Sequence, residues 1–423
     1  MRFEITNTNG GVWIYDNQTN HIESLSGQPS NIDSCKEYFK YTGDKTAVEP
    51  FSRNEDSKHK KSKDIKKLRI QLGLNCNYKC SFCLQASDKT LKTPAVVGDG
   101  IDRFFEMMDD AGIVVRPDAK IELWGGEPLV YWKTIKQFAP MLRERYPDCT
   151  LSTVSNGTLM NENILSFFLD NKIDITFSHD AQAYFLRGAD PLDDPKMRSM
   201  WLKTHEEYKK NNLSFGINTV ISQYNANLFD IQKFFEERLS KEIGFGFEGV
   251  VIAHTPNAIP FTKFPKREAE LLRQSIFKAI VFDQESNVGR ALHRRANGLI
   301  ARIVNKVPAN TIGGRCDVMN PHVLGVDMYG SVLTCHNVDP TEQSVGHLND
   351  YQHINLNKFD HWSVRKKCPS CLVLNGCQGN CMRNNEFFHN ASCDVEYMFH
   401  GFIFEAVWFL LTGSEIATVR EVD

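Results

Sequence analysis

The chain has 423 residues, of which 41% are hydrophobic and 24% are charged, and these proportions are typical of folded globular proteins. The length predicts two or three domains. A formal net charge of -3 gives no overall field that would attract nucleic acid or an anionic membrane, so we expect neither as a partner.

The two ends and the cysteine content bear on the compartment. The N-terminus lacks the basic start and apolar run of a secretory signal, and the last apolar stretch, residues 397–411, is short for a membrane span and carries His400 and Glu405. We therefore expect a packed helix in a cytoplasmic protein. Twelve cysteines in such a chain predict metal ligation rather than disulfides. Cys35 and Cys149 stand alone and are interpreted as ordinary thiols.

The first 64 residues are predicted to be a β-rich extension followed by a charged linker. Strand-like runs interrupted by Asn-Gly and by "DNQTN" predict one or two hairpins within residues 1–45. Residues 48–67 are rich in lysine and serine and are interpreted as solvated linker, with docking of an acidic peptide leader as the alternative.

From residue 68 short apolar runs alternate with helical patterns. The predicted strands are 68–74, 120–125, 150–155, 173–178, 215–222 and 244–253, and the predicted helices include 98–112, 131–146, 161–171 and 227–239. Six such units predict a parallel sheet with helices outside, as an open doubly wound sheet or an incomplete barrel, with ligands at the carboxyl ends of the strands. Two helices are expected in a bridge over 263–312, and an irregular cysteine-rich domain over 313–423.

Three cysteines lie in the stretch "CNYKCSFC", directly after the first predicted strand of the core. These are Cys76, Cys80 and Cys83, and the next 37 residues contain no cysteine or histidine that would complete a tetrahedral zinc site. Three thiolates on a tight loop suit three irons of a 4Fe-4S cube, whose fourth iron stays open for a small molecule.

Cys-x3-Cys-x2-Cys with an aromatic residue, Phe82, before the third cysteine resembles the radical S-adenosylmethionine (SAM) enzymes. In that family the open iron is chelated by the methionine moiety of SAM, and an electron from the cluster cleaves a carbon-sulfur bond to give a 5′-deoxyadenosyl radical. The resemblance implies a partial (β/α)6 TIM-like barrel over 65–262, with SAM and a 4Fe-4S cluster as cofactors. It also implies an external one-electron donor of the flavodoxin or ferredoxin type.

Further matches stand at the ends of the next strands. "LWGGEPLV" ends the second strand, "VSNGTL" the third and "FSHDAQAYFLRG" the fourth. By the resemblance, the cofactor contacts are Phe82, Gly125, Gly126, Glu127, Asn156, Ser178 and Arg187. Many relatives read Ser-Leu-Asp-Gly at the fourth strand, whereas this chain reads Ser178-His179-Asp180-Ala181. Asp180 is a candidate catalytic residue, and His179 is interpreted as a hydrogen-bonded core histidine.

Seven cysteines of the C-terminal region form the frame Cys-x13-Gly-x4-Cys, a gap, then Cys-x2-Cys-x5-Cys-x3-Cys-x11-Cys. This frame resembles the SPASM extension, an iron-sulfur-binding domain with two auxiliary 4Fe-4S clusters. The resemblance implies one cluster on Cys368, Cys371, Cys377 and Cys393, and a second on Cys316, Cys335 and Cys381. Either Asp317 or His336 completes the second site, or one iron is left open for a substrate atom. A zinc-ribbon-like module is the structural alternative.

These resemblances predict an oxidoreductase-type maturase that modifies a ribosomally made precursor peptide, through a thioether or carbon-carbon crosslink or a similar oxidation. One alternative is oxidation of a serine or cysteine to formylglycine, as in sulfatase maturation, with His336 as a candidate catalytic base. An alternative of another class is a non-catalytic electron carrier or zinc-binding protein. The N-terminal strands are candidates to bind a peptide leader at an exposed edge, or to form a structural extension packed on the barrel.

Overall fold

The fold is known from a computed structural model, which describes residues 1–53, 60–85, 93–356 and 359–422. Its largest sheet has nine strands in the order β12-β11-β10-β4-β5-β6-β7-β8-β9. The six strands from β4 to β9 are parallel, and they confirm the α/β partial barrel predicted from the sequence. Their bounds are β4 (Asp64–Gln71), β5 (Val114–Trp124), β6 (Thr150–Ser155), β7 (Ile173–Ser178), β8 (Phe215–Ile221) and β9 (Phe245–Val250).

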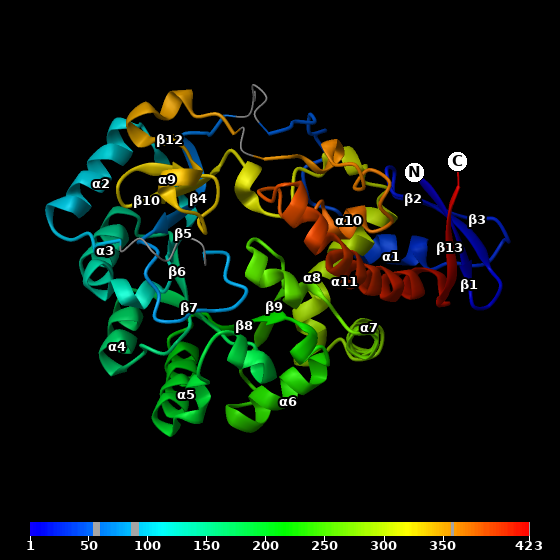
Figure 1. The fold of residues 1–423 in the computed structure, drawn as a ribbon, viewed down its shortest axis with the longest axis horizontal. Helices are drawn as coiled ribbons and strands as arrows, with labels where there is room; N and C mark the ends of the chain where they lie inside the picture. Colours follow the sequence, from blue (N-terminus) through cyan, green and yellow to red (C-terminus); the bar gives the residue numbers. More distant parts are fainter. Residues whose placement is uncertain (54–59, 86–92, 357–358, 423) are drawn as a thin grey trace.

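Five helices run along the outer side of this curved sheet (Figure 1). They are α2 (Asp99–Asp110), α3 (Trp132–Arg145), α4 (Glu162–Asp170), α5 (Pro195–Lys210) and α6 (Leu228–Arg238). Each helix buries at least one large aromatic side chain completely, in chain order Phe104, Phe138, Phe168, Trp201 and Phe235. Burial of each ring contributes roughly 1.5–3 kcal/mol, so a regular series of aromatic anchors holds the helices on the sheet.

The strands of the C-terminal region extend the barrel sheet. They are β10 (Val323–Asp327), β11 (Ser331–Leu333) and β12 (Ser344–His347), with the short helices α9 (Pro340–Gln343) and α10 (Leu374–Cys377) nearby in the chain. β10 pairs with β4 in parallel, and β11 and β12 continue the sheet as antiparallel strands. Residues 313–423, which the sequence predicts to be irregular, therefore contribute strands to the sheet of the barrel.

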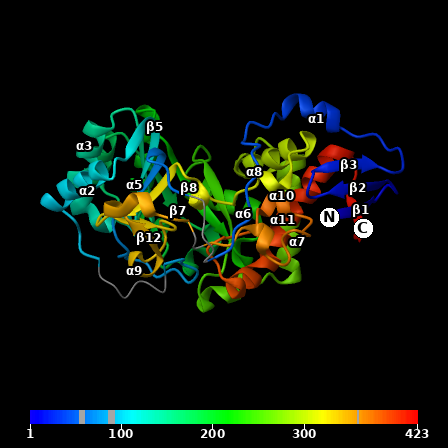
Figure 2. The same ribbon diagram turned by 90° about the horizontal axis from the view of Figure 1, so that it is seen from above.

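A second sheet joins the two ends of the chain. It has the order β13-β1-β2-β3 and consists of β1 (Arg2–Asn7), β2 (Val12–Asp16), β3 (His21–Ser24) and β13 (Ile416–Val422). The predicted N-terminal hairpins are confirmed. Strand β13 already occupies one edge of β1, so that edge is closed to a leader peptide. Figures 1 and 2 both place this sheet at the opposite end of the molecule from α2 and α3.

The N-terminal sheet packs on the last helix and not on the barrel, which corrects the sequence-based expectation. The ring centroids of Trp13 and Trp408 are 6.1 Å apart, and those of Tyr15 and Phe404 are 5.2 Å apart. Both partners lie on α11 (Glu386–Thr412), which also contacts the helices α1 (Ile32–Tyr38), α7 (Lys266–Val281) and α8 (Asn287–Val304). Among the described helices, only α11 is long and apolar enough to cross a membrane, and 61% of its most apolar window is buried inside the protein.

The interpretation of 48–67 as solvated linker is wrong for two of its lysines, while residues 54–59 lie outside the described residues. The ammonium group of Lys61 donates to the carbonyl oxygens of Asn320 at 3.2 Å and Val323 at 2.6 Å. Burial and the nearby Arg69 lower the pKa of Lys61 to about 8. Lys67 is part of β4 and pairs with Glu122 at 3.0 Å.

Candidate cofactor and cluster sites

The loop with Cys76, Cys80 and Cys83 follows β4 and is held by the turn that follows β5. The backbone amide of Gly126 donates to the carbonyl of Gly73 at 2.9 Å, and that of Glu127 donates to Asn75 at 2.9 Å. A Cβ atom on Gly126 would lie 2.4 Å from the carbonyl oxygen of Leu74. Glycine is therefore required at this position, because two backbone segments approach each other too closely for any side chain.

Glu127 connects the ends of two neighbouring strands. Its buried carboxylate accepts hydrogen bonds from the Ser155 hydroxyl at 2.7 Å, the Asn156 amide at 2.7 Å and the Leu129 amide at 3.0 Å. Burial raises the pKa of Glu127, and the three donors act in the opposite direction. With only 1% of its surface exposed, this side chain supports the Gly-Gly turn, and it is the backbone of the turn that remains to contact a ligand.

Asn156 braces the cysteine loop from the end of β6. Its side-chain amide donates to the Asn77 carbonyl oxygen at 2.8 Å, and Asn77 in turn donates to the Thr158 hydroxyl at 2.8 Å. The loop after β4 is thus fixed by the turns after β5 and β6, which are two of the places where the sequence predicts cofactor contacts.

Arg187 lies against the same loop and connects two of the predicted site residues. Its guanidinium group stands 5.3 Å from the ring centroid of Phe82 and donates to both carboxylate oxygens of Asp180, at 2.6 and 3.0 Å. The backbone amide of Val220 also donates to Asp180. Both oxygens of the candidate catalytic residue Asp180 therefore accept hydrogen bonds within the protein, and its carboxylate is buried.

The interpretation of His179 as a core residue is confirmed. Its Nε2 lies 2.9 Å from a carboxylate oxygen of Asp190, its Nδ1 accepts from the Ala181 amide, and only 2% of its surface is exposed. Ser178, the last residue of β7, is half-buried at the carboxyl end of the sheet.

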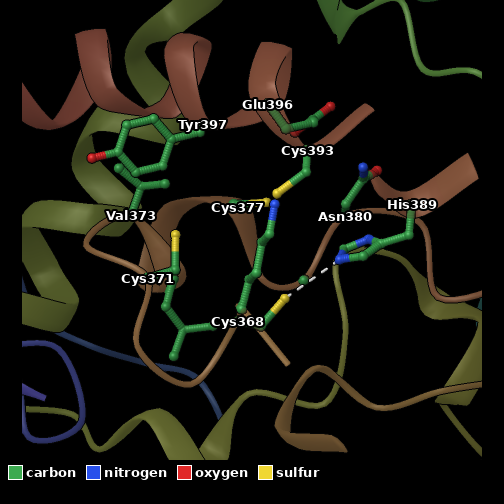
Figure 3. A pocket seen from close by; sticks show the side chains of 12 residues that line it. Cys368, Cys371, Val373, Cys377, Asn380, His389, Cys393, Glu396 and Tyr397 are labelled. Atoms are coloured by element: carbon green, nitrogen blue, oxygen red, sulfur yellow. Dashed lines mark hydrogen bonds between the residues drawn. The ribbon is translucent and has the colours of Figure 1, made fainter. Parts of the chain in front are cut away.

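Cys368, Cys371, Cys377 and Cys393 line one small cavity, as Figure 3 shows. The first three come from the loop around α10 and the fourth from α11. His389 lies beside them, with its Nε2 atom 3.7 Å from the sulfur of Cys368. Burial raises the pKa of Cys368 to about 12 and of Cys371 to about 11, so a metal that binds here has to displace thiol protons.

Cys316, Cys335 and Cys381 line a second and much larger cavity of about 1030 Å³. The same cavity is lined by Leu84, next to Cys83, and by Trp124, which ends β5 and contacts His336, the residue after Cys335. This cavity therefore lies between the carboxyl ends of the barrel strands and the three-cysteine group.

The described cysteines do not fit a single small ion. Tetrahedral zinc with Zn–S bonds of about 2.3 Å would bring its thiolates to about 3.8 Å from one another. In the described part of the chain, the one group of three metal-binding side chains with all ligand atoms within 4.8 Å consists of Cys377, Glu396 and His400, and it contains a single cysteine. The cysteine groups fit a wider inorganic core such as an iron-sulfur cluster.

A buried polar atom between the two cavities also supports an iron-sulfur cluster as the group that the cysteines hold. Asn380 lines both cavities and is 1% exposed, and its Nδ2 atom has no hydrogen-bond partner among the described residues. It belongs to a left-handed run of Gln378, Gly379 and Asn380, with φ values of 56°, 83° and 60°, between two cysteines. An amide donor left unpaired at this place suits the sulfur atoms of a cluster.

Asp317 and His336, the candidate fourth ligands, have other neighbours. Asp317 pairs with Arg69 at 3.3 Å and with Lys67 at 3.5 Å. The His336 ring lies edge-on to Trp124 at 4.2 Å, and burial together with Arg69 and Lys67 lowers its pKa well below the ordinary value.

Sequence reasoning missed Asn380 and the arginines of the large cavity, because only the fold brings them next to the cysteines.

Residues 70–235 match the Radical SAM superfamily. This segment is a radical SAM domain. Over 201 residues the chain is 25% identical to the radical SAM cyclopropyl synthase TigE of Paramaledivibacter caminithermalis, and over 193 residues it is 27% identical to the uncharacterized protein MJ0907 of Methanocaldococcus jannaschii. These alignments cover 43% and 44% of this chain, and only 41% of TigE and 61% of MJ0907.

The radical SAM domain and the region that follows it together have the fold of a solved structure. The structure of native anSMEcpe with bound AdoMet matches 81% of this chain and 98% of its own chain, with a TM-score of 0.59 and 19% identity. A second structure of anSMEcpe, with bound AdoMet and Cp18Cys peptide, matches with a TM-score of 0.59 and 18% identity over 82% of this chain and 98% of its own. The likeness establishes the fold.

Proposed function

We propose that this chain is a radical SAM maturase of the SPASM type, which abstracts hydrogen from a residue of a ribosomally made peptide and installs a crosslink or a similar oxidative change. Cys76, Cys80 and Cys83 hold the cluster that binds SAM, and the seven C-terminal cysteines hold two auxiliary clusters. When bound, the first cluster supplies the electron that converts SAM into a hydrogen-abstracting radical.

One observation carries the proposal: Leu84, which directly follows Cys83 of the cysteine loop, and the three-cysteine group line a common cavity of about 1030 Å³. A cavity of this size accommodates a segment of peptide between the place where hydrogen is abstracted and the place where an auxiliary cluster accepts an electron or a substrate atom. An electron carrier that works without a bound substrate has no need of such a space.

Some residues of the chain would bind SAM, and others would keep those residues in place. The backbone of Gly125 and Gly126 receives the amino group of SAM, while Glu127 and Asn156 keep that turn and the cysteine loop in place. Arg187, held by Asp180, offers its remaining donors to the cofactor beside Phe82. Together these residues would hold bound SAM beside the cysteine loop and restrict its orientation.

A peptide substrate is part of the proposal. TigE is by name a cyclopropyl synthase, and anSMEcpe binds a peptide on the same fold. The four-cysteine group lies behind the large cavity, and we assign to it electron transfer to an external one-electron carrier.

The test is anaerobic reconstitution followed by iron, sulfide and zinc analysis, reduction, and detection of 5′-deoxyadenosine. We expect about twelve irons per chain and cleavage of SAM. The matched variant replaces Cys76, Cys80 and Cys83 by alanine, and it should keep about eight irons and lose cleavage. The control replaces Cys35 and Cys149, which lie outside all three groups, and should behave as the unaltered enzyme. Undiminished cleavage in the first variant, or zinc in place of iron, would refute the proposal.

A further inference from the structure

The large cavity is strongly basic, although the chain as a whole has a formal net charge of -3. Of the described residues that line it, seven are arginine or lysine and one, Glu248, is acidic. Glu248 accepts a hydrogen bond from the Asn218 side chain at 2.5 Å. The positive charge is therefore concentrated where the substrate must lie.

Several of these basic side chains already have a role. Arg69 pairs with Glu122 at 2.6 Å, and Arg315 pairs with Glu396 at 2.5 Å. Arg302 is buried and bonded to Tyr41, Thr311 and Asn375, and Arg383 lies in the electrostatic surroundings of Cys335. Ion pairs, hydrogen bonds or the neighbouring Cys335 account for these four, and the seventh basic residue of the lining, Lys40, is exposed in the chain after α1.

Arg294 and Arg295 on α8 differ from these four arginines. Arg294 is exposed, and no carboxylate pairs with either residue in the part of the chain that the structure describes. Arg295 donates to the backbone carbonyls of Phe247 at 2.9 Å and Glu248 at 2.6 Å, which fix its guanidinium group at the end of β9. Two of its five N–H donors are used in this way, so donors remain for a ligand.

The electrostatic surroundings of Arg295 favour an anion. Burial and the positive charges of Arg315 and Arg294 lower the pKa of Arg295, and Glu248 and Glu396 act in the opposite direction. Glu396 is paired with Arg315 and Glu248 accepts from Asn218, so a further negative group beside Arg295 would supply hydrogen bonds and reduce the repulsion between the arginines. Guanidinium groups prefer carboxylates, because both partners are planar and form two parallel hydrogen bonds.

We propose that Arg294 and Arg295 form a subsite for a side-chain carboxylate of the substrate, so that the peptide segment entering the cavity contains aspartate or glutamate. This inference rests on the proposed function, since it places a peptide in the cavity. It concerns binding in the ground state, and it is tested without reductant and without SAM cleavage.

The probes are two short peptides, acetyl-Glu-Gly-Glu-amide and acetyl-Gln-Gly-Gln-amide, titrated calorimetrically into the anaerobically reconstituted full-length protein. We expect the glutamate peptide to bind roughly ten-fold more tightly, because charge-assisted hydrogen bonds replace neutral ones. Raising the salt from about 50 mM to about 300 mM should reduce this preference, because Arg294 is exposed to solvent.

Arg294→Gln should reduce the preference several-fold, and the double variant with Arg295→Gln should bring the ratio close to one. Arg290→Gln is the matched control: it removes one exposed positive charge from the same helix outside the cavity, and it should leave the preference unchanged. Since Arg294 is exposed, its single variant tests the subsite even where the double variant does not fold.

Equal affinity for the two peptides, absence of binding by the glutamate peptide, or an equal effect of Arg290→Gln would overturn the subsite. Inorganic phosphate is the competitor, and displacement of the glutamate peptide by phosphate at lower concentration than by free acetate would show a phosphate site instead. A protein that binds the glutamate peptide selectively and does not cleave SAM would keep the subsite and refute the proposed function.

Discussion

Arg315 and Glu396 form a buried ion pair, with Nη1 and Oε2 2.5 Å apart, that connects the two cysteine groups of the C-terminal region. Arg315 directly precedes Cys316 of the three-cysteine group, while the carboxylate of Glu396 lies within 4.8 Å of the sulfur of Cys377 in the other group. His400 adds a second contact to the carboxylate at 3.2 Å. The ion pair therefore helps to fix the position of the three-cysteine group relative to the four-cysteine group, in addition to the covalent chain.

Glu396→Gln should lower the free energy of unfolding by about 3–5 kcal/mol, because it leaves the guanidinium group of Arg315 buried without a negative partner. Anaerobic urea denaturation followed by circular dichroism measures the change. Glu405→Gln on the same helix is the control, since that pair with Arg273 is about one-third exposed and should change stability by no more than about 1 kcal/mol. Similar effects of the two substitutions would contradict a special role for the buried pair.

Gly126→Ala should displace the cysteine loop, because the added Cβ would lie 2.4 Å from the Leu74 oxygen and 2.5 Å from the Asn75 oxygen, both backbone atoms. We expect the affinity for SAM to fall at least about ten-fold while the iron of the C-terminal region is retained. Equilibrium binding of SAM and iron analysis measure both quantities. Gly244→Ala is the control, since its Cβ would meet no atom within 4 Å. Unchanged SAM affinity in Gly126→Ala would show that the turn does not position the cofactor.

The sequence predicts the barrel strands well, because the pattern that identifies each strand lies within the strand and its adjoining turns. Strands β6 and β7 begin and end at the predicted residues, since each is a short β-branched run bounded by polar turn residues. The Gly-Gly-Glu-Pro stretch is predicted as a cofactor turn, and the structure adds that Glu127 works through Ser155 and Asn156. Their hydrogen bonds cross between strands, which no local pattern reveals.

The strands that the sequence did not predict depend on distant partners. β10 pairs with β4 across more than 250 residues, and β13 pairs with β1 at the other end of the chain. Four β-branched residues within 416–422 are a local signal for β13, but nothing local indicates which edge this strand covers. Lys61 was misplaced for the same reason, since the carbonyls that bind it come from residues 320 and 323.

Asp180→Asn should weaken the binding of SAM without a comparable loss of turnover, because Asp180 holds Arg187 and does not face substrate. We expect the KM for SAM to rise about ten-fold, as a charge-assisted contact is loosened, with kcat changed by less than about two-fold. A pH profile of kcat is the second measurement, and it should keep its shape. A large loss of kcat with an unchanged KM would instead identify Asp180 as a catalytic base.

Trp13→Ala should lower the free energy of unfolding by about 3–5 kcal/mol, because the ring is buried against Trp408 and its removal leaves a cavity between the N-terminal sheet and α11. Tyr38→Ala, at an exposed aromatic side chain of the same extension, should change stability by less than about 0.5 kcal/mol. Thermal unfolding of both variants, with the clusters loaded, measures the difference. A stable Trp13→Ala protein would mean that the N-terminal sheet is dispensable for folding and free to serve recognition.

Asn380→Gly should lower the reduction potential of one auxiliary cluster, because it removes the buried amide donor that lies between the two cysteine groups. Glycine adopts the observed φ of 60° without strain, so the backbone of the loop should be preserved. A hydrogen bond that favours the reduced form by about 1 kcal/mol corresponds to about 40 mV for a one-electron couple.

Redox titration followed by electron paramagnetic resonance measures the shift for each cluster. Gln378→Gly is the control, since it has the same left-handed conformation and keeps the Asn380 donor. Equal potentials in the two variants would show that Asn380 makes no hydrogen bond to a cluster, whereas a shift confined to one signal would identify the cluster that it contacts.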